Sequence, residues 1–142
     1  MTTARRRGLL DTRTVILLPR LRDPAALPAE PLISTITLAE LSVGPLVARS
    51  DEERANRQAH VQQAEADFDP LPFDAAAARS FGHVAASLRR AGRTAPARTY
   101  DAMIASVAIA NELPLYTCNP GGFTGIDGLT IHEIPHPDHG TH

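Results

Sequence analysis

The sequence predicts an α/β domain with a mainly parallel sheet, because short apolar strands alternate with helical patterns along the chain. The clearest unit is Arg98–Phe123, which reads RTYDAMIASVAIANELPLYTCNPGGF. Its apolar residues recur at a helical spacing as far as the approach to Pro114, and a proline disfavours the helical conformation in the residue before it. We therefore expect a helix that ends before Pro114, a strand at 115–117 and a polar loop at 119–122.

Two earlier strands are each followed directly by a helix. Residues 8–10 form the first predicted strand and residues 14–18 begin the next helix, while residues 32–36 form a second, β-branched strand. The remaining predicted elements are a solvated helix over 50–69, a short strand at 71–73, a helix over 75–91 capped by Asp74, and an edge strand over 129–134.

The length of the chain suits one domain. A chain of 142 residues buries roughly 70% of the surface that it exposes when unfolded. We expect the domain to span 1–135. Residues 136–142 are rich in histidine, but their spacing fits no closed metal site, and Pro135 and Pro137 keep the segment extended. We therefore predict a disordered tail over 136–142.

The composition is that of a soluble globular protein, with 43% hydrophobic and 21% charged residues. The longest apolar run, Val15–Leu18, is far shorter than the ~20 residues that span a bilayer. A lone cysteine, Cys118, cannot form an internal disulfide framework. We expect a cytoplasmic protein with no membrane segment. The chain contains no lysine, which excludes a P-loop nucleotide site and Schiff-base catalysis.

Three carboxylates fall at the carboxyl edge of the predicted sheet. Asp11 ends the first strand, Glu40 lies in the first turn after the second, and Asp101 lies in the first turn of a later helix. Two of them also have a structural interpretation: Asp11 as a helix N-cap, and Glu40 as the partner of Thr37 in a T-x-x-E capping box. Open α/β sheets bind their ligands at this edge, so we expect the three carboxylates to lie together with Asn119.

This arrangement predicts metal-dependent chemistry on a phosphodiester. Carboxylates so close together repel one another at neutral pH unless a cation lies between them, and all-oxygen sites select Mg²⁺ or Mn²⁺. Such an ion lowers the pKa of a bound water and neutralises phosphoryl charge during in-line displacement. Because the formal net charge is only −2, a nucleic acid has to be contacted locally. Arg13 and Arg98 flank cluster residues and are the predicted substrate-binding residues.

Several segments resemble one known family. LLDT at 9–12, ITLAEL at 36–41 and RTYDAMIASVAIANELPLYTCN at 98–119, followed by GGFTGI, are similar to the PIN domain, specifically to the VapC ribonuclease toxins of bacterial toxin–antitoxin pairs. The resemblance implies a three-layer α/β/α domain and a Mg²⁺-dependent endoribonuclease that acts on structured RNA. It also implies a cognate antitoxin and a homodimer. The implied catalytic residues are Asp11, Glu40, Asp101 and Asn119, and the first three are the implied metal ligands.

The chain departs from the family pattern at two positions. Arg13 stands where the family commonly has serine, and Gly122 stands where it has an aspartate. Losing that fourth carboxylate predicts weaker metal binding and occupancy of only one metal site. Asp127 is an alternative fourth carboxylate, although it lies beyond a turn. The competing hypothesis is a catalytically impaired PIN-like module that binds RNA or an antitoxin without cutting.

Two other enzyme classes fit poorly. A haloacid-dehalogenase-type phosphatase needs a second carboxylate two residues after the first, and Arg13 occupies that position. A dinucleotide-binding oxidoreductase needs a glycine-rich turn after the first strand, and LLDTRT contains no glycine.

Overall fold

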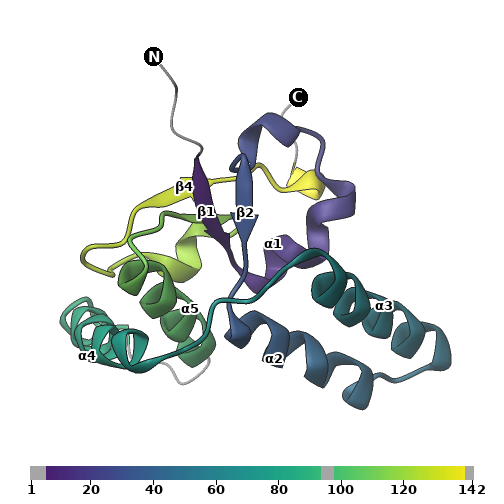
Figure 1. Cartoon of the computed structure of the whole chain (residues 1–142), viewed down its shortest axis with the longest axis horizontal. Coiled ribbons are helices and arrows are strands. Elements are labelled where there is room, and N and C mark those ends of the chain that lie inside the picture. The colour runs from purple at the N-terminus through teal and green to yellow at the C-terminus, as the bar shows by residue number, and fades with distance from the viewer. Residues whose placement is uncertain (1–5, 94–97, 140–142) are drawn as a thin grey trace.

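The computed structural model describes residues 6–93 and 98–139. Its centre is one sheet in which four short strands run parallel in the order β2-β1-β3-β4 (Figure 1). The strands are β1 (Arg7–Leu10), β2 (Glu30–Leu32), β3 (Leu115–Thr117) and β4 (Ile131–Glu133). The predicted α/β class with a parallel sheet is confirmed, and the last strand lies at an edge as expected.

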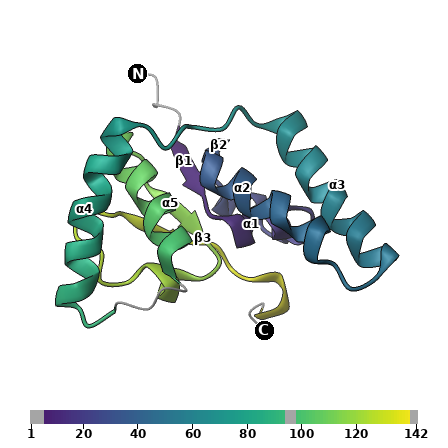
Figure 2. The ribbon, with the colours of Figure 1, turned by 90° about the horizontal axis from the view of Figure 1, so that it is seen from below.

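Helices cover both faces of the sheet. They are α1 (Thr12–Leu17), α2 (Thr35–Val43), α3 (Asp51–Asp67), α4 (Ala75–Arg90) and α5 (Thr99–Ala110). Figures 1 and 2 show α4 and α5 side by side on one flank, with α2 and α3 on the other. Short 3-10 turns occur at Leu18–Arg20, Pro24–Ala26, Gly44–Val47, Pro120–Phe123 and Pro137–His139. No helix in the part of the chain that is described is long and apolar enough to cross a membrane.

The alternation of side chains along the strands creates two cores. Leu9 and Leu115 point to one face and pack with α4 and α5. Leu10 and Tyr116, the next residues along, point to the other face and pack with α1, α2 and α3. These four side chains are at most 5% exposed. The domain therefore has three layers, with the sheet between two helical layers.

The second strand ends earlier than predicted. β2 stops at Leu32, and Ser34 caps α2 by accepting a hydrogen bond from the Thr37 amide at 3.2 Å. The predicted strand over 32–36 is therefore right only at Leu32, since β2 lies earlier in the chain and Thr35 and Ile36 belong to α2. Thr37 is not the cap of a box with Glu40. Ser34 is a strong capping residue placed one residue before the helix, so the helix begins there instead. Glu40 is consequently free to face away from its own backbone.

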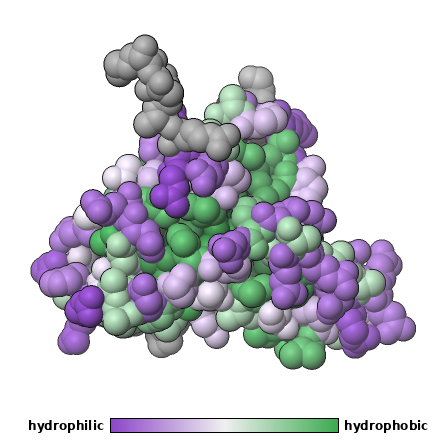
Figure 3. All heavy atoms as spheres, in the orientation of Figure 1, coloured by the Kyte–Doolittle hydropathy of each residue, from purple (hydrophilic) through white to green (hydrophobic). Residues whose placement is uncertain are grey.

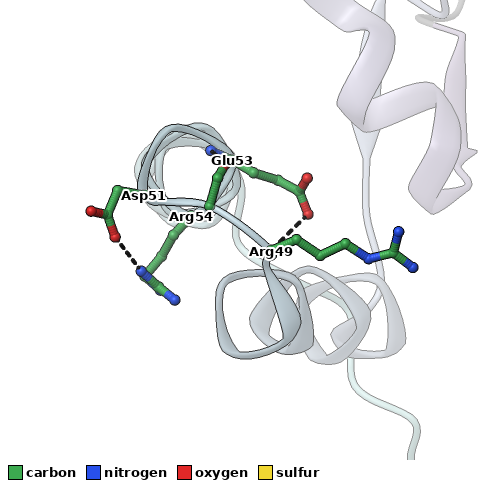
Figure 4. Close-up of polar contacts among 5 residues, drawn as sticks. Arg49, Asp51, Glu53 and Arg54 are labelled. Atoms are coloured by element: carbon green, nitrogen blue, oxygen red, sulfur yellow. Dashed lines mark hydrogen bonds and ion pairs between the residues drawn. The ribbon is translucent and has the colours of Figure 1, made fainter.

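An arrangement similar to a capping box lies at the start of α3, although its glutamate accepts from the amide of the residue before the cap (Figure 4). Ser50 accepts from the Glu53 amide at 3.0 Å, and the Glu53 carboxylate accepts from the Arg49 amide at 3.3 Å. Asp51 and Arg54 form an ion pair at 2.9 Å on the same turn. The hydrophilic surface over α3 in Figure 3 agrees with the predicted solvated helix.

The predicted strand at 71–73 is wrong. Leu71 makes one bridge with Ser34, in which the Leu71 amide donates to the Ile33 carbonyl at 2.9 Å. Pro70 and Pro72 flank it and have no amide hydrogen, so the ladder cannot extend. The cap of the following helix is confirmed, since Asp74 accepts from the Ala77 amide at 3.0 Å.

The predicted tail begins with a defined conformation. Pro137–His139 forms a 3-10 turn, and Asp138 pairs with Arg20. Residues 140–142 lie outside the described part of the chain.

We predict that Gly8→Ala destabilises the domain by about 1 to 3 kcal/mol, because overpacking a core forces neighbouring atoms to shift. A Cβ at Gly8 would overlap the ring of Tyr116. That ring is 5% exposed and is stacked on His132 with centroids 4.7 Å apart, so it has little room to move. Urea unfolding measures the change. The control is Gly82→Ala in the exposed middle of α4, where a Cβ meets nothing within 4 Å. It is expected to stabilise by roughly 0.5 to 1 kcal/mol, and equal effects of the two variants would contradict the packing argument.

Candidate active site

The predicted site residues line one cleft at the carboxyl edge of the sheet. Asp11 follows β1, Glu40 projects from α2, Asp101 lies in the first turn of α5, and Asn119 follows β3. The cleft has a volume of about 410 Å³ and is also lined by Thr12, Arg13 and Ile16. Parallel strands place their carboxyl ends at the same edge, which is why residues from four distant segments meet here.

Asp11 is the buried member of the cluster, at 4% exposure. Its Oδ1 accepts hydrogen bonds from the amide of Thr14, at 3.3 Å, and from the Thr14 hydroxyl, while its Oδ2 accepts from the Thr117 hydroxyl at 3.0 Å. Burial raises the pKa of Asp11, and the hydrogen bonds from Thr14 and Thr117 offset part of that rise. The predicted N-cap is confirmed, and the capping carboxylate lines the cleft as well.

The two buried threonines extend this network into the next strand. The Thr14 hydroxyl accepts from the Cys118 amide at 3.0 Å, and the Thr117 hydroxyl accepts from the Asn119 amide at 2.9 Å. Both threonines are fully buried. They were not predicted as site residues from the sequence, although each hydroxyl lies within three residues of a predicted one. They fix the distance between Asp11 and the chain that carries Asn119.

Glu40 faces the cleft through a hydrogen bond to a neighbouring helix. The Thr12 hydroxyl donates to Glu40 Oε1 at 2.6 Å and is also hydrogen-bonded to the Thr37 hydroxyl at 3.0 Å. Burial and the nearby charge of Asp11 raise the pKa of Glu40, and the bond from Thr12 lowers it. This contact between α1 and α2 takes the place of the capping box that the sequence suggested.

Asp101 has the most strongly shifted carboxyl group. Burial raises its pKa to about 6, and the charges of Asp11 and Glu40 contribute to the rise, while Arg98 and Arg13 lower it. A carboxylate in the first turn of a helix normally benefits from the helix dipole. The pKa of Asp101 is raised mainly because the carboxyl group is desolvated in the cleft, and the two neighbouring acids add to the rise.

The chemistry of the donors fits a hard divalent cation. Asp11, Glu40 and Asp101 offer carboxylate oxygens and Asn119 offers an amide oxygen. Among the residues that the structure describes, no three His, Cys, Asp or Glu side chains are arranged to hold a metal ion. Mg²⁺ is commonly bound through one or two carboxylates with several waters, so a site for it does not require three side chains in direct contact with the ion. Asp101 is only half-buried, whereas both oxygens of Asp11 already accept hydrogen bonds.

Gly122 lies beside the cluster. A Cβ built on it would lie 3.2 Å from Asp101 Oδ2, 3.2 Å from Asn119 Nδ2 and 3.9 Å from Arg98 Nη1. An aspartate here would therefore place its carboxylate against Asp101. Asp127 does not replace it, because Asp127 pairs with Arg90 at 2.9 Å and is not among the residues that line the cleft.

The two arginines predicted to bind substrate take different positions. Arg13 is exposed and lines the cleft. Arg98 lies behind Gly122, where its Nη1 donates to the Gly122 carbonyl at 3.2 Å. Within the described residues, Arg13 forms no ion pair with a carboxylate, so it lowers the pKa of Asp101 without direct pairing.

The sequence profile of the PIN domain family matches residues 10–129. The chain belongs to this family. It is 36% identical over 136 residues to Ribonuclease VapC5 of Mycobacterium tuberculosis, covering 94% of this chain and 98% of the relative. It is 35% identical over 101 residues to the tRNA(fMet)-specific endonuclease VapC of Shigella flexneri, covering 71% of this chain and 73% of the relative.

Two solved structures of related proteins resemble this fold. The crystal structure of VapBC-5, a toxin–antitoxin system of Mycobacterium tuberculosis, gives a TM-score of 0.76 at 32% identity, covering 90% of this chain and 98% of that one. DNA-bound VapBC of Salmonella typhimurium gives 0.73 at 28% identity, covering 90% and 98%. The predicted three-layer PIN fold and the resemblance to the VapC toxins are confirmed.

We predict that Asp101→Asn stabilises the protein at pH 7.5 in EDTA. In the folded chain Asp101 titrates near 6, above its ordinary 3.8. The folded state therefore keeps a proton that the unfolded chain has lost, and stability falls as pH rises through this window. Asparagine removes that penalty. The expected gain is roughly 1 to 2 kcal/mol. A pKa shift of one unit corresponds to about 1.4 kcal/mol, and solvent screening of a half-exposed carboxylate reduces the full value.

Urea unfolding at pH 4 and pH 7.5 measures this effect. The gain is expected to shrink toward pH 4, where Asp101 is protonated in the folded chain. An equal gain at both pH values would contradict the electrostatic explanation.

Proposed function

We propose that this protein is a metal-dependent endoribonuclease, the toxin of a toxin–antitoxin pair, which uses Mg²⁺ or Mn²⁺ to hydrolyse phosphodiester bonds of structured RNA. The observation that carries the proposal is the convergence of Asp11, Glu40 and Asp101 on one cleft with raised pKa values. The names of the two relatives, a ribonuclease and a tRNA-specific endonuclease, support the same activity.

The residues of the cleft have distinct tasks in this proposal. Asp11 and Asp101 would hold the cation, with Glu40 as the third acidic partner. A divalent cation bound there supplies an acidified water and neutralises charge on the phosphoryl oxygens. Thr14 and Thr117 orient the Asp11 carboxylate through the hydrogen bonds described above. The Asn119 side chain can orient the attacking water, and Arg13 at the mouth of the cleft can contact a substrate phosphate.

We also propose that the protein binds a cognate antitoxin and forms a homodimer. The antitoxin is supported by the solved VapBC structures, of which VapBC-5 of Mycobacterium tuberculosis is a member of the VapBC family of toxin–antitoxin systems. Apolar side chains are available to a partner at the turn between α2 and α3, where Val43, Leu46 and Val47 are 50%, 85% and 60% exposed.

A second function is favoured by one observation. Gly122 leaves the cleft with one carboxylate fewer than the family pattern, so the protein would be a module that binds RNA or its antitoxin without cutting. The three retained carboxylates and their shared cleft favour the enzyme.

We predict that the purified protein cleaves RNA into discrete fragments with Mg²⁺ or Mn²⁺ and not with EDTA. Asp11→Ala and Asp101→Ala are expected to lower the rate by more than the roughly 10- to 100-fold that loss of an outer-shell partner costs. Gel analysis of a total RNA preparation measures the activity, and circular dichroism checks folding of each variant. A folded wild-type protein that cleaves nothing would favour the binding module.

We predict that Gly122→Asp binds Mn²⁺ roughly 10-fold more tightly than the parent, because affinity for hard cations rises with the number of charged ligands. Calorimetry measures the affinity. Gly121→Asp is the matched control, since a Cβ there comes no closer to other atoms than 3.9 Å, from Asn119 Oδ1, and is not directed at Asp101. If Gly122→Asp binds Mn²⁺ no better than the parent, the explanation from a missing ligand is wrong.

A further inference from the structure

A second pocket lies between α4 and α5, beside the catalytic cleft. It has a volume of about 370 Å³ and an apolar floor that includes Phe81, Leu88 and Ala102. Figure 2 shows the two helices running alongside each other here. Leu88 and Ala102 belong to the main core, and Phe81 is held by an edge-to-face contact with Phe73, with ring centroids 6.5 Å apart. The floor is therefore a fixed apolar surface.

Three arginines surround this floor. Arg89 projects from α4, and Arg93 and Arg98 stand at the two ends of the connection between α4 and α5. None of the described residues that line the pocket is acidic. Arg93 Nε is buried and has no hydrogen-bond partner among the described residues, and the Arg89 guanidinium forms no ion pair with them. Arg89 and Arg93 therefore bring positive charge to the pocket that pairs with no carboxylate among the described residues, in a chain of formal net charge −2.

The pocket is connected to the catalytic cleft through the loop after β3. Arg93 donates to the Gly121 carbonyl at 2.7 Å and Arg98 donates to the Gly122 carbonyl at 3.2 Å. These glycines belong to the loop that also carries Asn119 into the cleft, and the charge of Arg98 acts on Asp101. The two sites are also neighbours on α5, where Asp101 lines the cleft and Ala102 lines the pocket.

We propose that the α4–α5 pocket binds a nucleotide of the RNA chain that neighbours the scissile bond. In this subsite Arg89 and Arg93 contact its phosphate, and the apolar floor receives its base or ribose. This inference rests on the proposed function, because it extends the RNA path from the catalytic cleft.

The groups that line the pocket are suited to binding a nucleotide. Guanidinium groups bind phosphate oxygens in a forked geometry, and a base presents a flat apolar face that packs against an aromatic ring. The acidic cleft repels a polyanion, so an RNA chain needs a positive surface next to it. Arg13 provides positive charge at the mouth of the cleft, and the α4–α5 pocket provides it beyond the loop of Asn119.

The test compares two neighbouring arginines of α4. Arg89→Gln removes a pocket charge, whereas Arg90→Gln removes the same charge from a residue that pairs with Asp127 and does not line the pocket. The probe is a fluorescein-labelled single-stranded RNA of mixed sequence, measured by anisotropy in EDTA so that no metal-dependent cleavage occurs. Arg89→Gln is expected to weaken binding about 5- to 10-fold and to reduce the dependence of log K on log salt by about 0.7, the value for one phosphate contact.

Arg90→Gln is expected to bind RNA as the wild type does. Steady-state cleavage with Mn²⁺ provides a second readout, in which Arg89→Gln raises KM and leaves kcat nearly unchanged, because a flanking contact is made equally in the ground and transition states. Unchanged affinity and salt dependence in Arg89→Gln would overturn the subsite. So would an equal loss in both variants, which would indicate a general charge effect.

The binding experiment separates this inference from the proposed activity. If the wild type cleaves RNA and Arg89→Gln binds it normally, the subsite is wrong and the nuclease stands. If the wild type cleaves nothing but Arg89→Gln alone loses RNA affinity, the subsite stands and the catalytic proposal fails. If Arg89→Gln binds RNA normally but binds an acidic peptide, polyglutamate, more weakly than Arg90→Gln does, the occupant is a protein and the RNA subsite is overturned.

Discussion

The burial of one carboxylate organises this site. Asp11 is 4% exposed at the end of β1, and its desolvation is offset by the hydroxyls of Thr14 and Thr117. Those hydroxyls in turn accept amide hydrogens from the chain after β3. A single buried charge thus ties the end of one strand to the start of α1 and to the loop that carries Asn119. The catalytic edge has a defined shape because leaving any of these groups unpaired is costly.

The fold brings three carboxyl groups together although their negative charges repel one another. The pKa values of Asp11, Glu40 and Asp101 are all raised, so at neutral pH the fold carries a repulsion that it would lose if the cluster were neutral. Such strain is common where a site is built for a ligand. Here the arrangement suits a positively charged ligand. Arg13 and Arg98 reduce the repulsion among the carboxylates without cancelling it.

The loop after β3 connects the two halves of the proposed RNA path. Gly121 and Gly122 bring backbone carbonyls close to Arg93 and Arg98, and Gly122 lies so near Asp101 that a Cβ there would be 3.2 Å from Asp101 Oδ2. Loss of a side chain at Gly122 therefore alters the cleft without disturbing the anchoring of the loop. The same two arginines that hold the loop also line the α4–α5 pocket.

The sequence alone determined the parallel α/β class, the strand at 115–117, the cap at Asp74 and the four cleft residues that follow or precede strands. These depend on local periodicity, on proline and capping chemistry, and on the rule that parallel strands end at one edge. Tertiary structure decided the rest. Glu40 was ambiguous until Ser34 proved to be the cap of α2, because local spacing cannot rank two capping residues three positions apart. Contacts between segments distant in sequence determine the roles of Thr14 and Thr117 and form the arginine-lined pocket. Local sequence patterns cannot predict such contacts.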